Sequence, residues 1–337
     1  MTDQLPVQKY VLYIDRDRHP INIFKNVEEA EYDLYKDVAI IAGPSSLDLG
    51  TAIANHLDAE LVPVDLRIFP DGESKIKVGK VEKDYCIIVQ STYPPTDRHL
   101  LQALMMINRC LENGSANVWA VMPYMAYSRQ DREFLDGEVV STALVAKLVE
   151  NVGTKRLITV DIHSPASLSY FTIDTQNISA VGLLAEYAAE KIKPNAPIVV
   201  SPDLGGAKRA AEFARILGTD MVALTKSRDK DTAQVFIEEK ELNSNVVGRD
   251  LILLDDMIST GESIVEACRF LRRYKPNKIY AVCTHALLLG DAMTRIKTAG
   301  VEEIISTNSI PGIYAKVDLA QLISAQLENS INAKNHP

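Results

Sequence analysis

The sequence predicts an α/β protein made of two similar, doubly wound domains with mainly parallel sheets. Short aliphatic runs alternate with helical stretches along the chain, and this alternation is typical of βαβ units. Four aliphatic runs fall in each half, so we expect the halves to resemble each other. The eight predicted strands are residues 38–43, 85–91, 118–124, 156–163, 197–203, 221–226, 250–256 and 278–288.

Helical stretches lie between these strands. The stretches at 100–114 and 141–153 both end in Gly, the residue that most often follows a helix C-terminus. The pattern predicts a first domain at 37–178 and a second at 179–337, joined near Asn177–Val181.

Residues 1–36 form a charged extension ahead of the two domains. Within it, residues 10–15 have the pattern of a strand and residues 27–35 that of a short helix. An added edge element or a subunit contact would account for this extension, and no residue in it indicates chemistry.

The composition is that of a soluble globular protein, with 47% apolar and 24% charged residues. A chain of 337 residues is too long for one core of ordinary size, which also favours two domains. The 36 basic and 45 acidic residues argue against a surface that coats nucleic acid, so an anionic substrate must meet a local basic patch. No signal-type apolar region begins the chain, and no run approaches the roughly 20 apolar residues of a membrane span, so we expect a cytoplasmic protein.

The cysteines are widely spaced in apolar sequence and form no CxxC or Cys/His cluster. This pattern argues against structural zinc and favours small buried hydrophobic side chains. They are Cys86, Cys110, Cys268 and Cys283.

The stretch LILLDDMISTGES (251–263) predicts a ligand site at the carboxyl end of a buried strand. Its paired carboxylates, Asp255 and Asp256, suit the hydroxyls of a ribose or a metal ion. A loop of small and hydroxylated residues then precedes a helical pattern, which is a natural phosphate site. The sequence therefore predicts a sugar phosphate here. The loop residues are Ser259, Thr260, Gly261 and Ser263.

The segment FPDGE (69–73) predicts a turn that presents polar and aromatic side chains. Pro70, Asp71 and Gly72 form the turn, with Phe69 and Glu73 on either side of it. The Phe69 ring could stack on a purine, and the two carboxylates could accept hydrogens from an exocyclic amine or ribose hydroxyls. An ordinary hairpin turn is the alternative.

The segment MPYMAYSRQDRE (122–133) places charged residues directly after a predicted strand. The guanidinium of Arg129 matches the geometry of phosphate oxygens, and Gln130 offers a donor and an acceptor to a base edge. Asp131 and Arg132 complete this polar loop. A solvated charged turn is the alternative.

Two further strands end in residues that could bind a metal. His163 ends one strand in the first half, and Asp203 ends the corresponding strand in the second half. Gly205 and Gly206 then open a helix, whose N-terminus favours anions. A phosphate-bound Mg²⁺ needs only one or two protein ligands, so His163 and Asp203 could suffice. A structural histidine is the alternative.

Lys226 and Arg228 lie one residue apart just after a strand. On a loop, both cations can face one anionic ligand, and phosphoryl-type transfer depends on such positioning and charge neutralisation. An isolated basic turn in solvent is the alternative.

The five segments, in this order and spacing, resemble the phosphoribosyl diphosphate synthetase (ribose-phosphate diphosphokinase) family. The resemblance runs from about Val38 to near the C-terminus, and the form SRQDREFLDGEVVS followed by DIHSP is most similar to the archaeal-type branch. It implies two phosphoribosyltransferase-like domains in a homo-oligomer. It also implies that the diphosphoryl group of ATP is transferred to the C1 hydroxyl of ribose 5-phosphate, with Mg²⁺, giving phosphoribosyl diphosphate and AMP for nucleotide biosynthesis.

The resemblance also implies a role for each motif. It assigns ATP to two segments, of which the second acts across a subunit interface in this family, and magnesium to His163 and Asp203. It assigns Lys226 and Arg228 to a mobile catalytic loop. The ATP-binding residues are Phe69, Asp71, Gly72, Glu73, Arg129, Gln130 and Asp131, and the ribose 5-phosphate residues are Asp255, Asp256, Ser259, Thr260, Gly261, Glu262 and Ser263.

Glu262 departs most from the family pattern, because it puts a carboxylate where the usual Asp-Thr-Gly-Gly-Thr loop has a glycine. Either its side chain points away from the ligand, or the 5-substituent of the ribose is not a simple phosphate. Transfer to another 5-substituted ribose therefore stays an alternative, as does a catalytically silent regulatory subunit. A phosphoribosyltransferase is disfavoured, because it would leave residues 69–73 and 129–130 without a role.

We predict that Lys226→Ala lowers turnover by orders of magnitude with little loss of stability, because a catalytic loop is expected to be exposed. Steady-state kinetics and a melting curve of the variant would test this. A parallel fall in melting temperature would show that Lys226 is structural.

Overall fold

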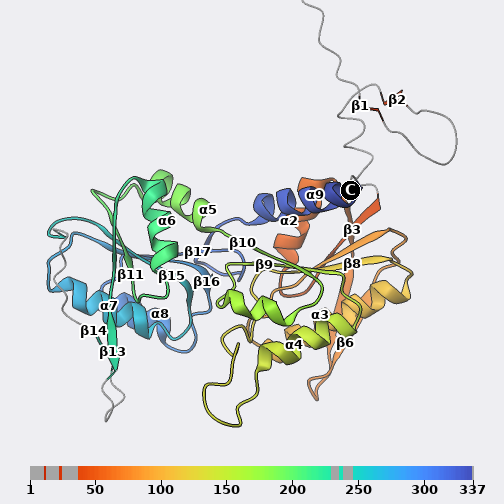
Figure 1. The fold of residues 1–337 in the computed structure, drawn as a ribbon, viewed down its shortest axis with the longest axis horizontal. Helices are drawn as coiled ribbons and strands as arrows, with labels where there is room; N and C mark the ends of the chain where they lie inside the picture. Colours follow the sequence, from red (N-terminus) through yellow and green to blue (C-terminus); the bar gives the residue numbers. More distant parts are fainter. Residues whose placement is uncertain (1–10, 13–22, 25–36, 229–234, 238–245, 336–337) are drawn as a thin grey trace, which may run out of the picture.

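The computed structural model describes residues 11–12, 23–24, 37–228, 235–237 and 246–335, and it has three layers (Figure 1). Two six-stranded sheets lie end to end in the middle layer, and helices cover both faces of each. All neighbouring strands within these sheets run parallel, as the sequence predicted.

The two sheets have the same strand order. The first, in spatial order, contains β4 (Glu60–Val62), β3 (Val38–Ala42), β7 (Tyr85–Val89), β8 (Asn117–Met122), β9 (Arg156–Val160) and β10 (Asp174–Ile178). The second contains β12 (Asp220–Ala223), β11 (Ile198–Ser201), β15 (Leu251–Ile258), β16 (Ile279–Ala286), β17 (Glu303–Thr307) and β18 (Ala315–Val317). In each sheet the chain order reverses once, between β3 and β7 and between β11 and β15, and ligands of open α/β sheets bind at such points.

Each of the eight predicted strands forms a strand, but each sheet has six strands where the sequence predicted four. Three of the extra strands are edge strands with little aliphatic sequence: β4, β10, whose residues DTQNI are all at least partly exposed, and β18, which has three residues. The fourth, β17, lies between β16 and β18, and only two of its five residues are aliphatic. Such strands lack the buried aliphatic run on which the prediction depended. Among the described residues, three strand pairs lie outside the two large sheets: β1 (Val11–Leu12) with β2 (Ile23–Phe24), β5 (Val64–Ile68) with β6 (Ser74–Val78), and β13 (Lys226–Arg228) with β14 (Val235–Ile237).

Helices occupy the predicted intervals. In chain order they are α2 (Leu47–Leu57), α3 (Thr96–Glu112), α4 (Ser141–Asn151), the 3-10 helix Pro165–Tyr170, α5 (Val181–Tyr187) with a following π-turn (Ala188–Ile192), α6 (Ala207–Leu217), α7 (Glu262–Arg272), α8 (Ala292–Ala299) and α9 (Ala320–Asn335). None of the helices in the described ranges is long and apolar enough to cross a membrane.

One apolar core joins the two halves. Helices α2, α5, α6 and α9 cover the same face of both sheets, upper in Figure 1, and their buried side chains form one cluster with both sheets. On the opposite face each half has its own core, one under α3 and α4 and one under α7 and α8. Helix α9 belongs to the second half by sequence but packs on α2 of the first. We therefore propose that the two domains divide at residue 178, between β10 and α5, and that α9 returns from the second domain to pack on the first.

The extension at 1–36 lies mostly outside the described residues. Within the predicted strand at 10–15, β1 (Val11–Leu12) pairs antiparallel with β2 (Ile23–Phe24). The predicted helix at 27–35 is outside the described residues. The four cysteines are buried and unbridged, which confirms the interpretation as small buried side chains.

We predict that Leu327→Ala, on α9, lowers the free energy of unfolding by about 2–5 kcal/mol, because Leu327 is fully buried in the core shared by both halves. Urea denaturation would measure this change. Gln321→Ala on the exposed side of α9 is the matched control, with an expected change within about 0.5 kcal/mol. An equal effect of the two substitutions would contradict the role of α9 in the shared core.

Candidate active site

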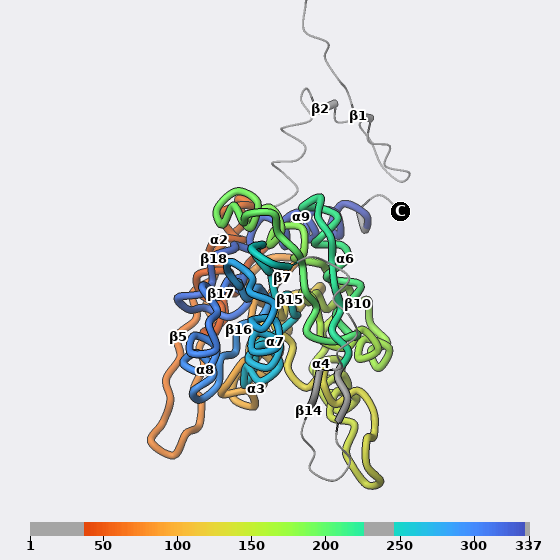
Figure 2. Tube along the Cα trace, turned by 90° about the vertical axis from the view of Figure 1, so that its left-hand side faces the viewer, coloured from red at the N-terminus to blue at the C-terminus, as the bar shows by residue number. Residues whose placement is uncertain are grey.

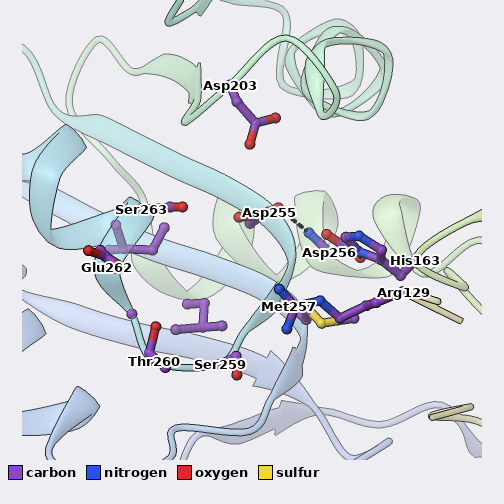
Figure 3. A pocket seen from close by; sticks show the side chains of 13 residues that line it. Arg129, His163, Asp203, Asp255, Asp256, Met257, Ser259, Thr260, Glu262 and Ser263 are labelled. Carbon is purple, nitrogen blue, oxygen red and sulfur yellow. Dashed lines mark hydrogen bonds and ion pairs between the residues drawn. The ribbon is translucent and has the colours of Figure 1, made fainter. Parts of the chain in front are cut away.

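A cavity of about 270 Å³ lies where the chain order of the second sheet reverses, between the carboxyl ends of β11 and β15 (Figure 3). Its lining comes mostly from β15 and the loop that leads into α7, and the first half contributes Arg129 and His163. Figure 3 shows these two residues on the opposite side of the view from Thr260, Glu262 and Ser263. The lining residues are Arg129, His163, Asp203, Asp255, Asp256, Met257, Ile258, Ser259, Thr260, Gly261, Glu262, Ser263 and Ile264.

The loop between β15 and α7 requires glycine at position 261. Gly261 has a φ of +75°, and a Cβ atom there would lie 2.7 Å from Cδ1 of Ile296 on α8. Helix α7 begins immediately afterwards, with Gly261 O accepting from Val265 N at 2.9 Å. The amides of the first helical turn therefore begin at the cavity wall, where an anion can accept their hydrogens.

Asp255 and Asp256 lie within β15 and not at its end, because β15 stays paired with β16 as far as Ile258. Burial raises the pKa of the Asp255 carboxyl, and the negative charges of Asp256 and Asp203 raise it further. A cation, or hydroxyls that donate hydrogen bonds, would offset this accumulation of negative charge.

Asp256 forms a bridge between the two halves of the chain. Its Oδ2 lies 2.7 Å from Nδ1 of His163. Its Oδ1 lies 3.7 Å from a guanidinium nitrogen of Arg209 on α6. Burial acts to raise the pKa of Asp256, but the hydrogen bond from His163 and the charge of Arg209 outweigh it, and the pKa falls below its usual range.

The ionised Asp256 fixes the hydrogen on the His163 ring. An ionised carboxylate can only accept, so Nδ1 carries the hydrogen and Nε2 is left as the ring atom that can contact a ligand. A carboxylate behind a histidine is the arrangement that orients this side chain in many metal sites. His163 itself lies three residues past Val160, where β9 ends, although the sequence predicted that this strand would continue to His163.

Arg209 was missed in the sequence. It is the third residue of α6, among other basic and small residues, and only its distance to Asp256 distinguishes it. Asp203 lines the cavity from two residues past Ser201, the last residue of β11, so this strand also ends earlier than the sequence predicted. Its Oδ1 accepts a hydrogen bond from Gly206 N at 3.2 Å, which orders the turn into α6.

Only one residue of the predicted ATP-binding loop lies at the cavity. Arg129 lines the cavity, but Gln130 and Asp131 do not. Asp131 instead accepts a hydrogen bond from Ser164 Oγ at 2.6 Å, next to His163. This contact ties the loop after β8 to the loop after β9.

The turn at 69–73 forms the tip of the hairpin β5–β6, as predicted, but does not line the cavity. The hairpin projects from the body of the molecule, in orange in Figure 2. Phe69 N donates to Glu73 O at 2.9 Å, and Glu73 N donates to Oδ1 of Asp71 at 3.1 Å. Gly72 has a φ of +95°, which the turn needs.

The backbone of Lys226 and Arg228 forms β13, and their side chains lie outside the described part of the structure. Glu262 is the first residue of α7, where a carboxylate stabilises a helix N-terminus. Its side chain is exposed at the edge of the cavity, away from His163 (Figure 3). This position favours the explanation that the Glu262 side chain points away from the ligand.

The comparisons with known proteins agree with this architecture. Residues 38–153 match the model of the N-terminal domain of ribose phosphate pyrophosphokinase, and residues 225–331 match that of the phosphoribosyl synthetase-associated domain. A ribose-phosphate pyrophosphokinase of Methanopyrus kandleri is 41% identical, over 86% of this chain and 98% of the relative. One of Methanobrevibacter smithii is 37% identical, over 86% of this chain and all of the relative.

A solved structure covers both halves. The crystal structure of phosphoribosylpyrophosphate synthetase from Mycobacterium smegmatis matches 88% of this chain and 98% of its own, with a TM-score of 0.76 and 27% identity. The predicted fold class, two phosphoribosyltransferase-like domains, is thereby confirmed. This chain belongs to the ribose-phosphate pyrophosphokinase family, with archaeal members among its relatives.

Proposed function

We propose that this protein transfers the diphosphoryl group of ATP to the C1 hydroxyl of ribose 5-phosphate, giving phosphoribosyl diphosphate and AMP. Family membership supports the reaction, and one observation carries the proposal for the site. The cavity combines carboxylates and a small-residue helix N-terminus from the second half with Arg129 and His163 from the first.

The second half is the proposed ribose 5-phosphate side. Asp255 and Asp256 accept hydrogen bonds from the ribose hydroxyls, and residues 259–263 hold the 5-phosphate. Because Asp256 is already paired with His163 and Arg209, its position is fixed before the sugar binds. Hydrogen bonds from the ribose hydroxyls would stabilise Asp255 more than Asp256, because Asp255 is buried and other negative charges already surround it.

The first half is the proposed ATP side. The guanidinium of Arg129 binds phosphate oxygens, and Gln130, Asp131 and the turn Phe69–Glu73 hold the rest of the nucleotide. The C1 oxygen attacks the β-phosphorus as the bond to the AMP oxygen breaks in line with it. Lys226 and Arg228 neutralise charge on the transferred group.

The side chains of His163 and Asp203 could bind a magnesium ion that arrives with ATP. Within the described residues, no three His, Cys, Asp or Glu side chains are arranged to hold a metal alone. Mg²⁺ bound to a triphosphate needs only one or two protein ligands, and Asp203 and His163 both line the cavity. Bound there, the ion would neutralise phosphate charge during transfer.

We propose a homo-oligomer with the active site near a subunit interface. Arg129 lines the cavity of its own chain, although the resemblance implied that this segment acts across a subunit interface. The support for a shared site is that the turn at 69–73 does not line this cavity, so a neighbouring subunit would have to supply it. An apolar groove between α3 and α4, lined in part by the exposed Leu101, Leu144 and Leu148, offers a surface for association. The proposed location is the cytoplasm, where buried thiols stay reduced.

We predict that the purified protein releases AMP from ATP with ribose 5-phosphate, and that EDTA abolishes the release. The assay is run with a panel of 5-substituted riboses. AMP release with another member of the panel but not with ribose 5-phosphate would contradict the assigned acceptor. If no acceptor gave AMP and the protein co-purified with an active synthetase, the silent-subunit alternative would hold.

We predict that Glu262→Gln lowers KM for ribose 5-phosphate about 2- to 5-fold and leaves kcat unchanged. Removing the charge weakens repulsion of the 5-phosphate, but by no more than about 1 kcal/mol, because the side chain is exposed and solvent screens it. Glu266→Gln, one turn further along α7, is the control and should leave KM unchanged. A loss of activity in Glu262→Gln would show that the carboxylate contacts the substrate.

A further inference from the structure

Two bridges, one beside the other, connect β9 and the residues after it to the second sheet. The first is the contact between His163 and Asp256 in the cavity. The second joins Oδ2 of Asp161 to the hydroxyl of Thr284, which donates to it at 2.7 Å. Asp161 lies two residues before His163. Thr284 lies beside Asp256 on the neighbouring strand, because β15 and β16 pair Asp255 with Cys283 and Met257 with His285.

The second bridge is buried, unlike the first. Asp161 is 6% exposed and Thr284 is fully buried, whereas the His163 side chain is 40% exposed. Asp161 Oδ2 also accepts from Ala180 N at 3.0 Å, and Asp161 N donates to Ile178 O at 2.9 Å. The carboxylate is thus held by β16 and by the chain entering α5.

The backbone at Asp161 takes a conformation that side chains rarely adopt. Its φ is +39°, in the left-handed region, and this turns the chain from β9 toward His163. A residue held in this region costs free energy, so the surrounding contacts must offset it. The hydrogen bonds that Thr284 and Ala180 donate to the Asp161 carboxylate help to offset this cost.

His285, the next residue of β16, holds the preceding residue of β9. Its Nε2 lies 3.0 Å from Val160 O, and a carbonyl can only accept, so Nε2 carries the hydrogen. Its Nδ1 lies 2.8 Å from Ser309 Oγ, and its ring packs edge-on against Tyr124. Val160 and Asp161 are therefore both attached to β16 before the chain reaches His163.

We propose that Asp161 and Thr284 are positioning residues that set the place of His163 against Asp256 for diphosphoryl transfer. This inference rests on the proposed role of His163 in the active site. Misplacement of a catalytic group by about 1 Å can cost about 100-fold in rate, so a buried hydrogen bond two residues away can control turnover. Substrate binding depends mainly on other residues, so loss of the Asp161–Thr284 hydrogen bond is expected to lower kcat and to leave the KM values nearly unchanged.

The test compares Thr284→Val, Thr284→Ser and the wild type by steady-state kinetics. Val keeps the shape but removes the hydroxyl, and we expect kcat to fall about 10-fold with both KM values within about 2-fold. Ser restores the donor and should restore kcat to within about 3-fold. Thr159→Val on β9 is the matched control, because the buried Thr159 hydroxyl has no hydrogen-bond partner among the described residues. Its kcat should not change.

A double-mutant cycle with His163→Ala separates positioning from general damage. If Thr284 acts through His163, Thr284→Val should lower kcat less than about 2-fold further in the His163→Ala background. A full 10-fold loss in that background, or an unchanged kcat in Thr284→Val alone, would overturn the proposal. Thr284→Ala repeats the test without placing a methyl group against the carboxylate, in case the Val variant does not fold.

Failure of the proposed function has a different signature, because the wild type would then release no AMP with ribose 5-phosphate. If the wild type makes phosphoribosyl diphosphate but His163→Ala keeps full kcat, then the role of His163 is wrong, and the positioning role falls with it. If His163→Ala loses activity and Thr284→Val does not, only the positioning role is wrong.

Discussion

The carboxyl end of β9 is held against the carboxyl ends of β15 and β16, and the candidate active site lies at this contact between the two sheets. Neither half contains the cavity alone, since Arg129 and His163 come from one and Asp203, Asp255 and the 259–263 loop from the other. Hydrogen bonds make this contact, and two residues that take part in them, Val160 and Ala180, also belong to the apolar core shared by both halves. Burial strengthens the bonds that are excluded from water. We infer that the buried part of this boundary, at Asp161, Thr284 and His285, helps to set the geometry of the candidate site.

The two halves share one strand order but use it differently. In the second half the reversal between β11 and β15 opens into the cavity. In the first half the reversal between β3 and β7 is filled by Gln90, whose Oε1 accepts from Ser45 N at 3.1 Å. A Cβ atom on Gly43 would lie 2.1 Å from the same oxygen, so the chain is packed closely around that side chain. Gln90 is therefore buried between the carboxyl ends of these strands, and a separate cavity of about 430 Å³ borders the loop after β3 at residues 44–49.

Much of the fold could be predicted because its central strands are aliphatic runs buried on both faces, such as Leu251–Leu254. The candidate site residues were predicted where such runs end in polar residues, as at Asp203 and Asp255, and both of these line the cavity. Edge strands such as β10 carry no such signal. Arg209 and the Asp161–Thr284 pair were missed for another reason. Thr284 is 123 residues from Asp161, and no local pattern shows that β16 brings them together.

The return of α9 to the first half limits how the enzyme can move. Helix α9 is the last described segment of the second half, yet its residues Ile323, Leu327 and Ile331 belong to the core that contains Leu49 and Ile53 of α2. Opening the halves like a hinge would expose that core to water, at a cost of about 25 cal/mol for each Å² of apolar surface. The shared core therefore disfavours a hinge motion between the halves, and we expect the two sheets to move as one rigid unit.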